Sequence, residues 1–234
     1  MSTLSDAWEA HAEAWTEWAR RPGHDSYWRF HRDAFLALVP APGRLTLDVG
    51  CGEGRVSRDL AALGHRVVAV DPTPTLTRLT AEAGGGLLGV LRADGAALPV
   101  PDGAADLVVA FMSLHDIDDM EGAVREIGRV LGPGGRLCMA IVHPVNSAGR
   151  FRSPDPDAEF VISGDYFAER RYRDVVEQNG LGMTFESRHR PLQDYFAALA
   201  ASGLVTELLR EPRPLTGNHW DRLPLFVDLR AARR

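Results

Sequence analysis

Short apolar runs alternate with amphipathic stretches through the middle of the chain. Thr46–Val49, Arg66–Val70 and Leu107–Phe111 are rich in aliphatic and β-branched residues, a composition typical of strands buried on both faces. Between the first two runs, Arg55–Leu63 places apolar residues three and four positions apart, as an amphipathic helix does. This alternation predicts an α/β fold with a doubly wound sheet of mainly parallel strands.

Capping and turn residues extend the pattern toward the C-terminus. Thr73 followed by Pro74 predicts the N-cap and first residue of a helix, and Gly132–Gly135 predicts the end of a helix over Asp119–Leu131. The other predicted elements are the strands Gly89–Arg92 and Arg136–Val142, the helix Pro191–Ser202, and the strands Leu204–Glu211 and Leu223–Leu229.

Two regions lie outside this alternation. Residues 3–20 show an amphipathic helical pattern with tryptophans along it, and Asp25–Val39 is predicted as a second helix. Between residues 145 and 190 loop-forming residues dominate, and only Tyr166–Glu177 is periodic. We expect this segment to be an insertion after the fifth strand that folds above the strand ends.

The loop after the first predicted strand has the composition of a cofactor-binding turn. Glycines alternate over Gly50–Gly54 directly after the strand that contains Asp48, and they permit close approach of a ligand to the main chain. Asp71 ends the second predicted strand, which places a carboxylate where ribose hydroxyls bind in such sheets. The glycine spacing is GxGxG, which differs from the GxGxxG of dinucleotide dehydrogenases. The sequence therefore predicts a nucleotide-type cofactor at this edge.

Four segments carry a family resemblance. LDVGCGEGR, VVAVDPT, DGAALPVPDGAADLVVA and LGPGGRL occur in this order within residues 45–145. With this ordered set the chain resembles the class I S-adenosylmethionine (SAM)-dependent methyltransferases, in particular the methyltransferase type 11 group typified by enzymes of ubiquinone and menaquinone biosynthesis. The resemblance implies a Rossmann-like sheet of seven strands whose last two form a C-terminal antiparallel hairpin. It also implies SAM-dependent methyl transfer to a small molecule.

The resemblance also implies a division of the chain and a set of cofactor contacts. A single methyltransferase domain would comprise an N-terminal helical lid (1–40), a cofactor-binding core (41–144), a substrate-lid insertion (145–190) and a C-terminal helix with strands (191–234). Asp48 would lie near the SAM ammonium, Asp71 would accept hydrogen bonds from the ribose hydroxyls, and Asp94 would bind the adenine amino edge. The implied cofactor-binding residues are Asp48, Gly50, Cys51, Gly52, Asp71, Pro72, Thr73, Asp94, Gly95, Ala96, Phe111, Met112 and Ser113.

Histidines beyond the strand ends are candidates for deprotonating the methyl acceptor. Some acceptors lose a proton during methylation, and histidine titrates in the required range. His143 follows the fifth predicted strand and is the first candidate for a general base. His115 follows the fourth and is the second, although it could instead form a hydrogen bond at a helix start, and a reaction without a protein base also stays open. The candidate substrate contacts are Tyr27, Tyr166, Tyr172 and His189.

The insertion is rich in aromatic and arginine residues. This composition favours a lid over an apolar or aromatic acceptor, including one that bears a carboxylate. The residues are Phe151, Phe160, Tyr166, Phe167 and Tyr172, with Arg150, Arg152, Arg170, Arg171 and Arg173.

A cluster of acids lies at the start of the predicted helix Asp119–Leu131. Asp116, Asp118 and Asp119 could hold magnesium, but acids at a helix start offset the helix dipole, and we favour that role. No metal is predicted.

Composition excludes several function classes. All 26 basic residues are arginine, which excludes a P-loop lysine, a pyridoxal phosphate Schiff base and a lysine nucleophile. The net charge of −6 argues against nucleic acid as a partner, and Cys51 and Cys138 lack metal-ligand spacing. No apolar run approaches the roughly 20 residues of a membrane span. We therefore expect a cytoplasmic monomer or homodimer that binds neither nucleic acid nor membrane.

Two other functions stay open. The first is a nicotinamide-dependent oxidoreductase, which the glycine spacing and the Asp94 segment disfavour. The second is a SAM-binding protein of the same fold with a non-methylating or regulatory role. The sequence leaves the acceptor open, and with it O-, N- or C-methylation.

Overall fold

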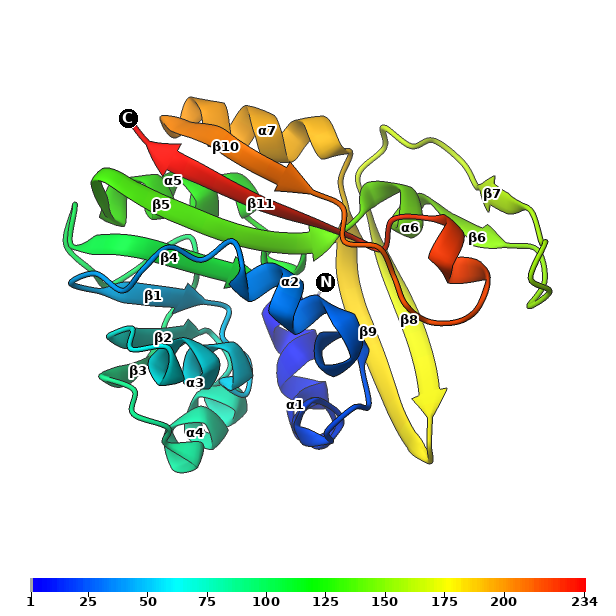
Figure 1. The fold of residues 1–234 in the computed structure, drawn as a ribbon, viewed down its shortest axis with the longest axis horizontal. Helices are drawn as coiled ribbons and strands as arrows, with labels where there is room; N and C mark the ends of the chain where they lie inside the picture. Colours follow the sequence, from blue (N-terminus) through cyan, green and yellow to red (C-terminus); the bar gives the residue numbers. More distant parts are fainter. Residues whose placement is uncertain (1) are drawn as a thin grey trace.

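The computed structural model describes residues 2–234 and is built around one seven-stranded sheet (Figure 1). The strand order is β10-β11-β5-β4-β1-β2-β3, in which β1 to β5 are parallel and β10 and β11 form the antiparallel hairpin at one edge. The doubly wound, seven-stranded fold is confirmed. The strands are β1 (Thr46–Val49), β2 (Val67–Asp71), β3 (Gly89–Arg92), β4 (Ala105–Phe111), β5 (Leu131–Val142), β10 (Leu204–Arg210) and β11 (Phe226–Arg233).

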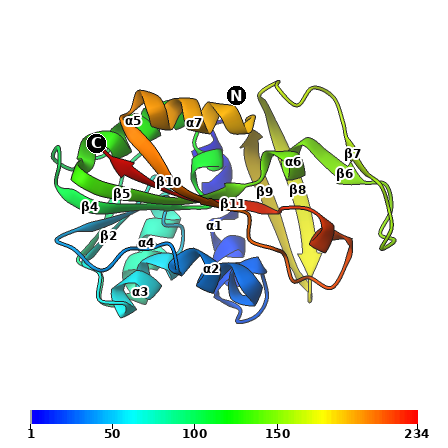
Figure 2. The same cartoon turned by 45° about the horizontal axis from the view of Figure 1, so that its top comes forward.

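Helices cover both faces of this sheet, as Figure 2 shows. Alternate side chains of β4 enter two separate cores: Val108 and Ala110 pack with α5 and α7, whereas Leu107 and Val109 pack with α2 and α3. This period of two explains why the central strands read as continuous apolar runs. The helices of the two layers are α2 (Arg32–Leu36), α3 (Arg55–Ala62), α4 (Pro74–Ala83), α5 (Met120–Val130) and α7 (Leu192–Ala201).

The N-terminal region contains the two predicted helices, but the second is irregular. Thr3 caps α1 (Leu4–Arg20) in a capping box with Asp6. The segment predicted as one helix begins instead with a π-helical turn, η1 (Tyr27–His31), and continues as the short α2. Both end residues of η1 are buried.

The insertion contains a long hairpin that the sequence analysis missed. β8 (Arg170–Gln178) and β9 (Leu181–His189) pair in full antiparallel register. Asn179 and Gly180 join them with positive φ angles of 52° and 78°, as a tight hairpin turn requires. Figure 1 shows the hairpin projecting from the sheet beside α1. The other elements here are α6 (Pro144–Ala148), β6 (Gly149–Phe151) and β7 (Phe160–Ile162).

Several strand boundaries also differ from prediction. β5 begins at Leu131, so the glycine-rich Gly132–Gly135 lies within the strand. β11 runs from Phe226 to Arg233 rather than from Leu223 to Leu229, because it pairs with β5 as far as Ala232 and with β10 as far as Arg233. Two 3-10 turns, η2 (Leu114–Asp116) and η3 (His219–Arg222), complete the chain. Among residues 2–234, no helix combines the length and apolar character that crossing a membrane requires.

Candidate active site

A cavity of about 900 Å³ lies at the carboxyl ends of β1, β2 and β4. This volume is within the range of small-molecule sites. Strand-end loops, α1, η1 and the β8–β9 hairpin all contribute to its lining. The cavity brings together the predicted cofactor residues with one exception: Ala96 lies outside the lining and donates its backbone N–H to Asp94 Oδ1 at 2.8 Å.

The glycine bend is packed so closely that side chains would fill it. Gly50 has a φ of 73°, and an added Cβ would overlap the Cβ of Ser113 at the end of β4. At Gly52 an added Cβ would come within 3.1 Å of the indole nitrogen of Trp15 on α1. The bend therefore offers bare main chain to a ligand while its neighbours hold its shape.

Asp71 fixes the bend to the start of α4. One carboxylate oxygen accepts the Gly52 N–H at 2.9 Å, and the other accepts the Thr73 N–H at 3.0 Å and its hydroxyl at 2.5 Å. Thr73 is at the N-cap position as predicted, although its hydroxyl bonds to Asp71 rather than to the helix. Burial raises the pKa of Asp71.

Asp48 and Cys51 are buried beside the bend. Asp48 accepts a hydrogen bond from the Ser57 hydroxyl at 2.5 Å, and burial raises its pKa to about 7. Burial also raises the pKa of the Cys51 thiol well above its ordinary value, so that thiol is a poor nucleophile. A cation bound next to Asp48 would favour the carboxylate form.

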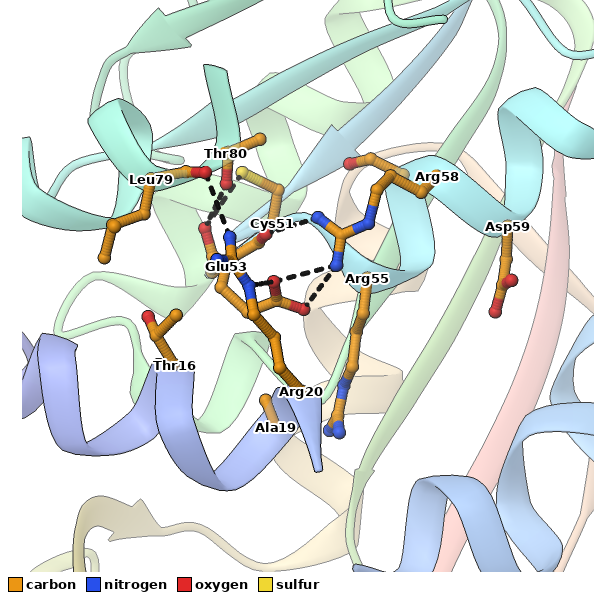
Figure 3. Close-up of polar contacts among 12 residues, drawn as sticks. Thr16, Ala19, Arg20, Cys51, Glu53, Arg55, Arg58, Asp59, Leu79 and Thr80 are labelled. Carbon is orange, nitrogen blue, oxygen red and sulfur yellow. Dashed lines mark hydrogen bonds and ion pairs between the residues drawn. The ribbon is translucent and has the colours of Figure 1, made fainter. Parts of the chain in front are cut away.

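Glu53 connects the bend to the helix that covers it (Figure 3). Its carboxylate is fully buried and accepts hydrogen bonds from Arg20 of α1 and Arg58 of α3, each at 2.8 Å. Close by, the Thr80 hydroxyl of α4 donates to the Gly52 carbonyl at 2.8 Å. Three helices are thus tied to the same five-residue loop, Gly50–Gly54.

The two predicted catalytic histidines lie in different environments. His143 lies outside the cavity lining: its Nδ1 accepts the Val145 N–H at 3.0 Å, and its Nε2 is 3.0 Å from Glu211 Oε1. His115 lines the cavity, and its Nδ1 has no hydrogen-bond partner within residues 2–234. Burial, with a smaller contribution from the Arg190 charge, lowers the pKa of His115 to about 3. Its imidazole is therefore neutral.

Of the four predicted substrate contacts, two line the cavity and two lie outside its lining. Tyr27 and Tyr172 line the cavity, whereas Tyr166 and His189 do not. The Tyr27 hydroxyl donates to Asp59, so only its ring is available to a ligand. His189 uses both nitrogens, since Nε2 donates to the Tyr166 carbonyl at 2.8 Å and Nδ1 accepts the Ser147 hydroxyl at 2.7 Å.

Of the insertion's arginines, Arg150 lines the cavity. Arg170 and Arg171 face other partners: Arg170 donates to the Ser147 carbonyl at 2.9 Å, and Arg171 pairs with Glu186 at 2.8 Å. The arginine content of the insertion therefore does not translate into a basic cavity wall.

The acidic cluster is also divided. Asp119 caps α5 by accepting the Gly122 N–H at 2.8 Å, and Asp118 pairs with Arg188 at 2.7 Å. All three residues line the cavity, and burial raises the pKa of Asp116 to about 8. Within residues 2–234, no group of three or more His, Cys, Asp or Glu side chains is arranged to hold a metal ion.

An aromatic wall of the cavity was missed by the sequence analysis. Trp8, Trp15 and Trp18 of α1 each contact Phe185 of β9 edge to face, with ring centroids 6.0 to 6.4 Å apart. The tryptophan spacing on α1 indicated an amphipathic helix, and that signal could have found three of the four aromatic residues. Phe185 could not be placed without the hairpin.

Comparison with known proteins identifies the family. A family model described as a methyltransferase domain matches residues 47–139. The demethylmenaquinone methyltransferase of Thermus thermophilus is 36% identical over 167 residues, which are 66% of this chain and 75% of that protein. The chain belongs to the S-adenosylmethionine-dependent methyltransferases.

Other matches agree with this assignment. A SAM-dependent methyltransferase structure from Mesorhizobium loti superposes with a TM-score of 0.72 at 23% identity, covering 89% of this methyltransferase and 98% of that chain. The ubiquinone biosynthesis O-methyltransferase of Xanthomonas oryzae pv. oryzae is 27% identical over 174 residues, 69% of each protein.

The cavity of this methyltransferase suits its cofactor, SAM. SAM carries a sulfonium and an ammonium, and the lining contains Asp48, Asp71 and Asp94, whose side chains form no ion pair with an arginine or histidine within residues 2–234. The glycine bend presents bare main chain next to these acids. An acidic cavity beside an uncovered bend fits a cationic nucleoside better than an anionic dinucleotide.

Proposed function

We propose that this methyltransferase transfers the SAM methyl group to a small acceptor with an apolar or aromatic body. One observation carries the proposal: a single cavity extends from the glycine bend past Phe111 to the tryptophan wall of α1 and to Phe226. Cofactor and acceptor can therefore occupy one volume. The names of two relatives, which refer to demethylmenaquinone and to ubiquinone biosynthesis, support an acceptor of the quinone-precursor type.

The cofactor end of the cavity would hold SAM through the predicted residues. We assign Asp48 to the ammonium, Asp71 to the ribose hydroxyls, and Asp94 with Gly95 to the adenine. Phe111, Met112 and Ser113 would border the sulfonium, which supplies a methyl carbon activated for in-line displacement. Met112 has a φ of 55°, a conformation that costs a side-chained residue energy and that is enriched at functional sites. This strain supports a role at the end of β4.

The remaining candidates take supporting roles in the proposal. His115 would orient the acceptor as a neutral hydrogen-bonding group, because a pKa of about 3 makes it a weak base. His143 would hold the start of α6 in place. α1 and the β8–β9 hairpin would cover the reacting atoms and exclude water, as the aromatic contacts between them suggest.

The proposal is tested in two steps. Calorimetry should show binding of SAM and of S-adenosylhomocysteine, and tryptophan quenching should show no comparable binding of NAD. Methyl-labelled SAM is then incubated with the enzyme, 1-naphthol, catechol and a small-molecule extract of bacterial cells. We expect label in small molecules. SAM that is bound but never consumed would favour the non-methylating alternative, and tighter binding of NAD would favour the oxidoreductase.

A further inference from the structure

His31 lines the cavity and forms a buried polar pair with Asp228. His31 ends the π-helical turn η1, whereas Asp228 lies within β11, 197 positions away. The His31 Nε2 and the Asp228 Oδ1 are 2.7 Å apart, and each side chain is only 1% exposed. Sequence reasoning did not find the pair, because the two residues meet only when the N-terminal segment folds over the last strand.

Asp228 is a fully buried carboxylate in β11, an interior strand of the sheet, where burial of a charge lowers the stability of the fold. Its Oδ2 has no hydrogen-bond partner within residues 2–234. Arg230, two positions along on the same face of β11, donates instead to Glu207 and to the Leu38 carbonyl. Burying a carboxylate that is satisfied by one imidazole costs stability, so its presence requires an explanation other than packing.

His31 lies beside Phe111, which the proposal above assigns to the border of the sulfonium. Its ring stacks on Phe226 with centroids 4.3 Å apart and lies 4.8 Å from the Phe111 ring; all three line the cavity. Asp228 is the charged group bonded to the ring, and its other close ring neighbours, Phe30 and Phe35, are uncharged. π-helical turns such as η1 occur frequently at functional sites.

The pair also determines which ring nitrogen can accept a proton. A carboxylate only accepts hydrogen bonds, so His31 Nε2 carries the proton and donates it to Asp228. Nδ1 then holds the free lone pair, which is the arrangement of a carboxylate-oriented general base.

We propose that His31 is the general base of the reaction and that Asp228 is its positioning residue, which identifies the acceptor as a hydroxyl compound such as a phenol, naphthol or quinol. This inference rests on the proposed methyl transfer. The acceptor O–H bond breaks and its proton moves to Nδ1, while an oxygen electron pair forms the bond to the methyl carbon. The S–CH₃ bond breaks with its electrons remaining on sulfur, giving S-adenosylhomocysteine. Asp228 stabilises the imidazolium until its proton passes to solvent.

His115 is less suited to this role. Its pKa of about 3 leaves little affinity for a proton, and its Nε2 is 3.6 Å from Asp116 Oδ1, beyond hydrogen-bond distance. A histidine whose imidazolium has no bonded carboxylate cannot share the charge that it would acquire.

The experiment compares two acceptors of different acidity. At slightly alkaline pH 1-naphthol keeps its proton, whereas 4-nitro-1-naphthol is already ionised and needs no base. We expect His31→Asn to lower kcat/KM for 1-naphthol by about 100-fold and for 4-nitro-1-naphthol by less than about 5-fold. Asp228→Asn should produce the same selective loss, because its amide donates to Nε2 and moves the ring proton to Nδ1.

A matched control and two outcomes separate the alternatives. His65, a buried histidine bonded to the Thr46 hydroxyl and outside the cavity lining, provides His65→Asn, which should leave the ratio of the two activities unchanged. Equal losses of kcat/KM with both naphthols would show that the pair only stabilises the fold and would overturn the inference. If His31→Asn does not fold, Asp228→Asn decides, since it replaces a buried charge by a neutral group of the same size.

Failure of the hydroxyl-acceptor inference can also be distinguished from failure of the proposed SAM-dependent function. If SAM binds but neither naphthol is methylated or bound to the S-adenosylhomocysteine complex, the hydroxyl acceptor is wrong and methyl transfer to another class stands. If SAM itself does not bind, the proposed function fails.

Discussion

The Glu53 carboxylate accepts a hydrogen bond from Arg20 Nε at 2.8 Å, which joins the glycine bend to the helix that covers it (Figure 3). Arg20 is 40% exposed whereas Glu53 is fully buried, so the pair spans the boundary between solvent and the loop. Together with Arg58 it neutralises a carboxylate that would otherwise be buried without a counter-charge. The position of α1 is therefore set partly by charge and not only by its tryptophans.

Removing Arg58 should destabilise the fold. Arg58→Met deletes the two hydrogen bonds to the buried Glu53 carboxylate, and we expect a loss of about 2 kcal/mol in the free energy of unfolding. Arg78→Met is the matched control, because Arg78 pairs with Glu82 on the helix surface and its loss should cost less than about 0.5 kcal/mol. Urea denaturation measures both. Equal costs would mean that the Glu53 contact is unimportant.

Gly50→Ala should impair SAM binding. The new Cβ would overlap Ser113, and the φ of 73° is unfavourable for alanine, so we expect at least about 10-fold weaker SAM binding in calorimetry. Gly164→Ala is the control, since Gly164 has a similar φ of 81° with open space around its Cβ position. It should lose stability without losing affinity. An unchanged affinity for Gly50→Ala would contradict the assigned cradle.

Asp71→Asn should weaken SAM and S-adenosylhomocysteine binding by about 10- to 100-fold. Both carboxylate oxygens of Asp71 accept main-chain N–H groups, whereas an amide has only one accepting oxygen and cannot serve both N–H groups and the ligand hydroxyls. The ribose role is isolated with 2′-deoxy-S-adenosylhomocysteine in a double-mutant cycle. We expect the variant to bind the normal and deoxy ligands almost equally. Additive losses would show that Asp71 shapes the bend but does not contact the ribose.

Asp116 should make stability depend on pH. Burial raises its pKa from 3.8 to about 8, so the folded protein holds a proton that the unfolded chain releases. Its stabilising contribution is complete below pH 3.8 and is lost as the pH rises toward about 8. Asp116→Asn should remove this part of the dependence, up to about 1.4 kcal/mol per pH unit, in urea denaturation across this window.

Asp106→Asn serves as the opposite-sign control for that experiment. Arg44 lowers the pKa of Asp106, so its contribution is present at higher pH and is lost as the pH falls. The control should therefore diverge from the wild type on the acidic side. Parallel curves for Asp116→Asn and the wild type would show that the Asp116 carboxyl titrates normally.

The cofactor half of the site could be predicted because its residues are close in sequence to regular elements. Asp48 and Gly50 belong to one strand and its loop, and Asp71 ends the next parallel strand, so the topology alone brings them to one edge. The acceptor half was harder. His143 follows β5 as expected, yet its ring turns away to cap α6, and no pattern in the sequence specifies that rotamer.

The β8–β9 hairpin could not be predicted from the sequence for a different reason. Asn179-Gly180 is a strong turn signal, and its flanks pair in register, but the exposed and charged residues of β8 hide the usual alternation. The strands are not part of the central sheet, and Phe185 of β9 packs instead on the tryptophans of α1, a surface that the sequence does not place beside it.

By itself the sequence determined the doubly wound sheet, the order of its elements and the edge at which we propose that SAM binds, because these depend on local periodicity and on glycines and acids within a few residues of a strand end. Only the tertiary structure decided which histidine meets a carboxylate and which aromatic rings enclose the cavity. His31 reaches Asp228, and Trp15 reaches Phe185, across most of the chain's length. Such contacts arise from packing between distant segments, which leaves no periodic trace in the sequence.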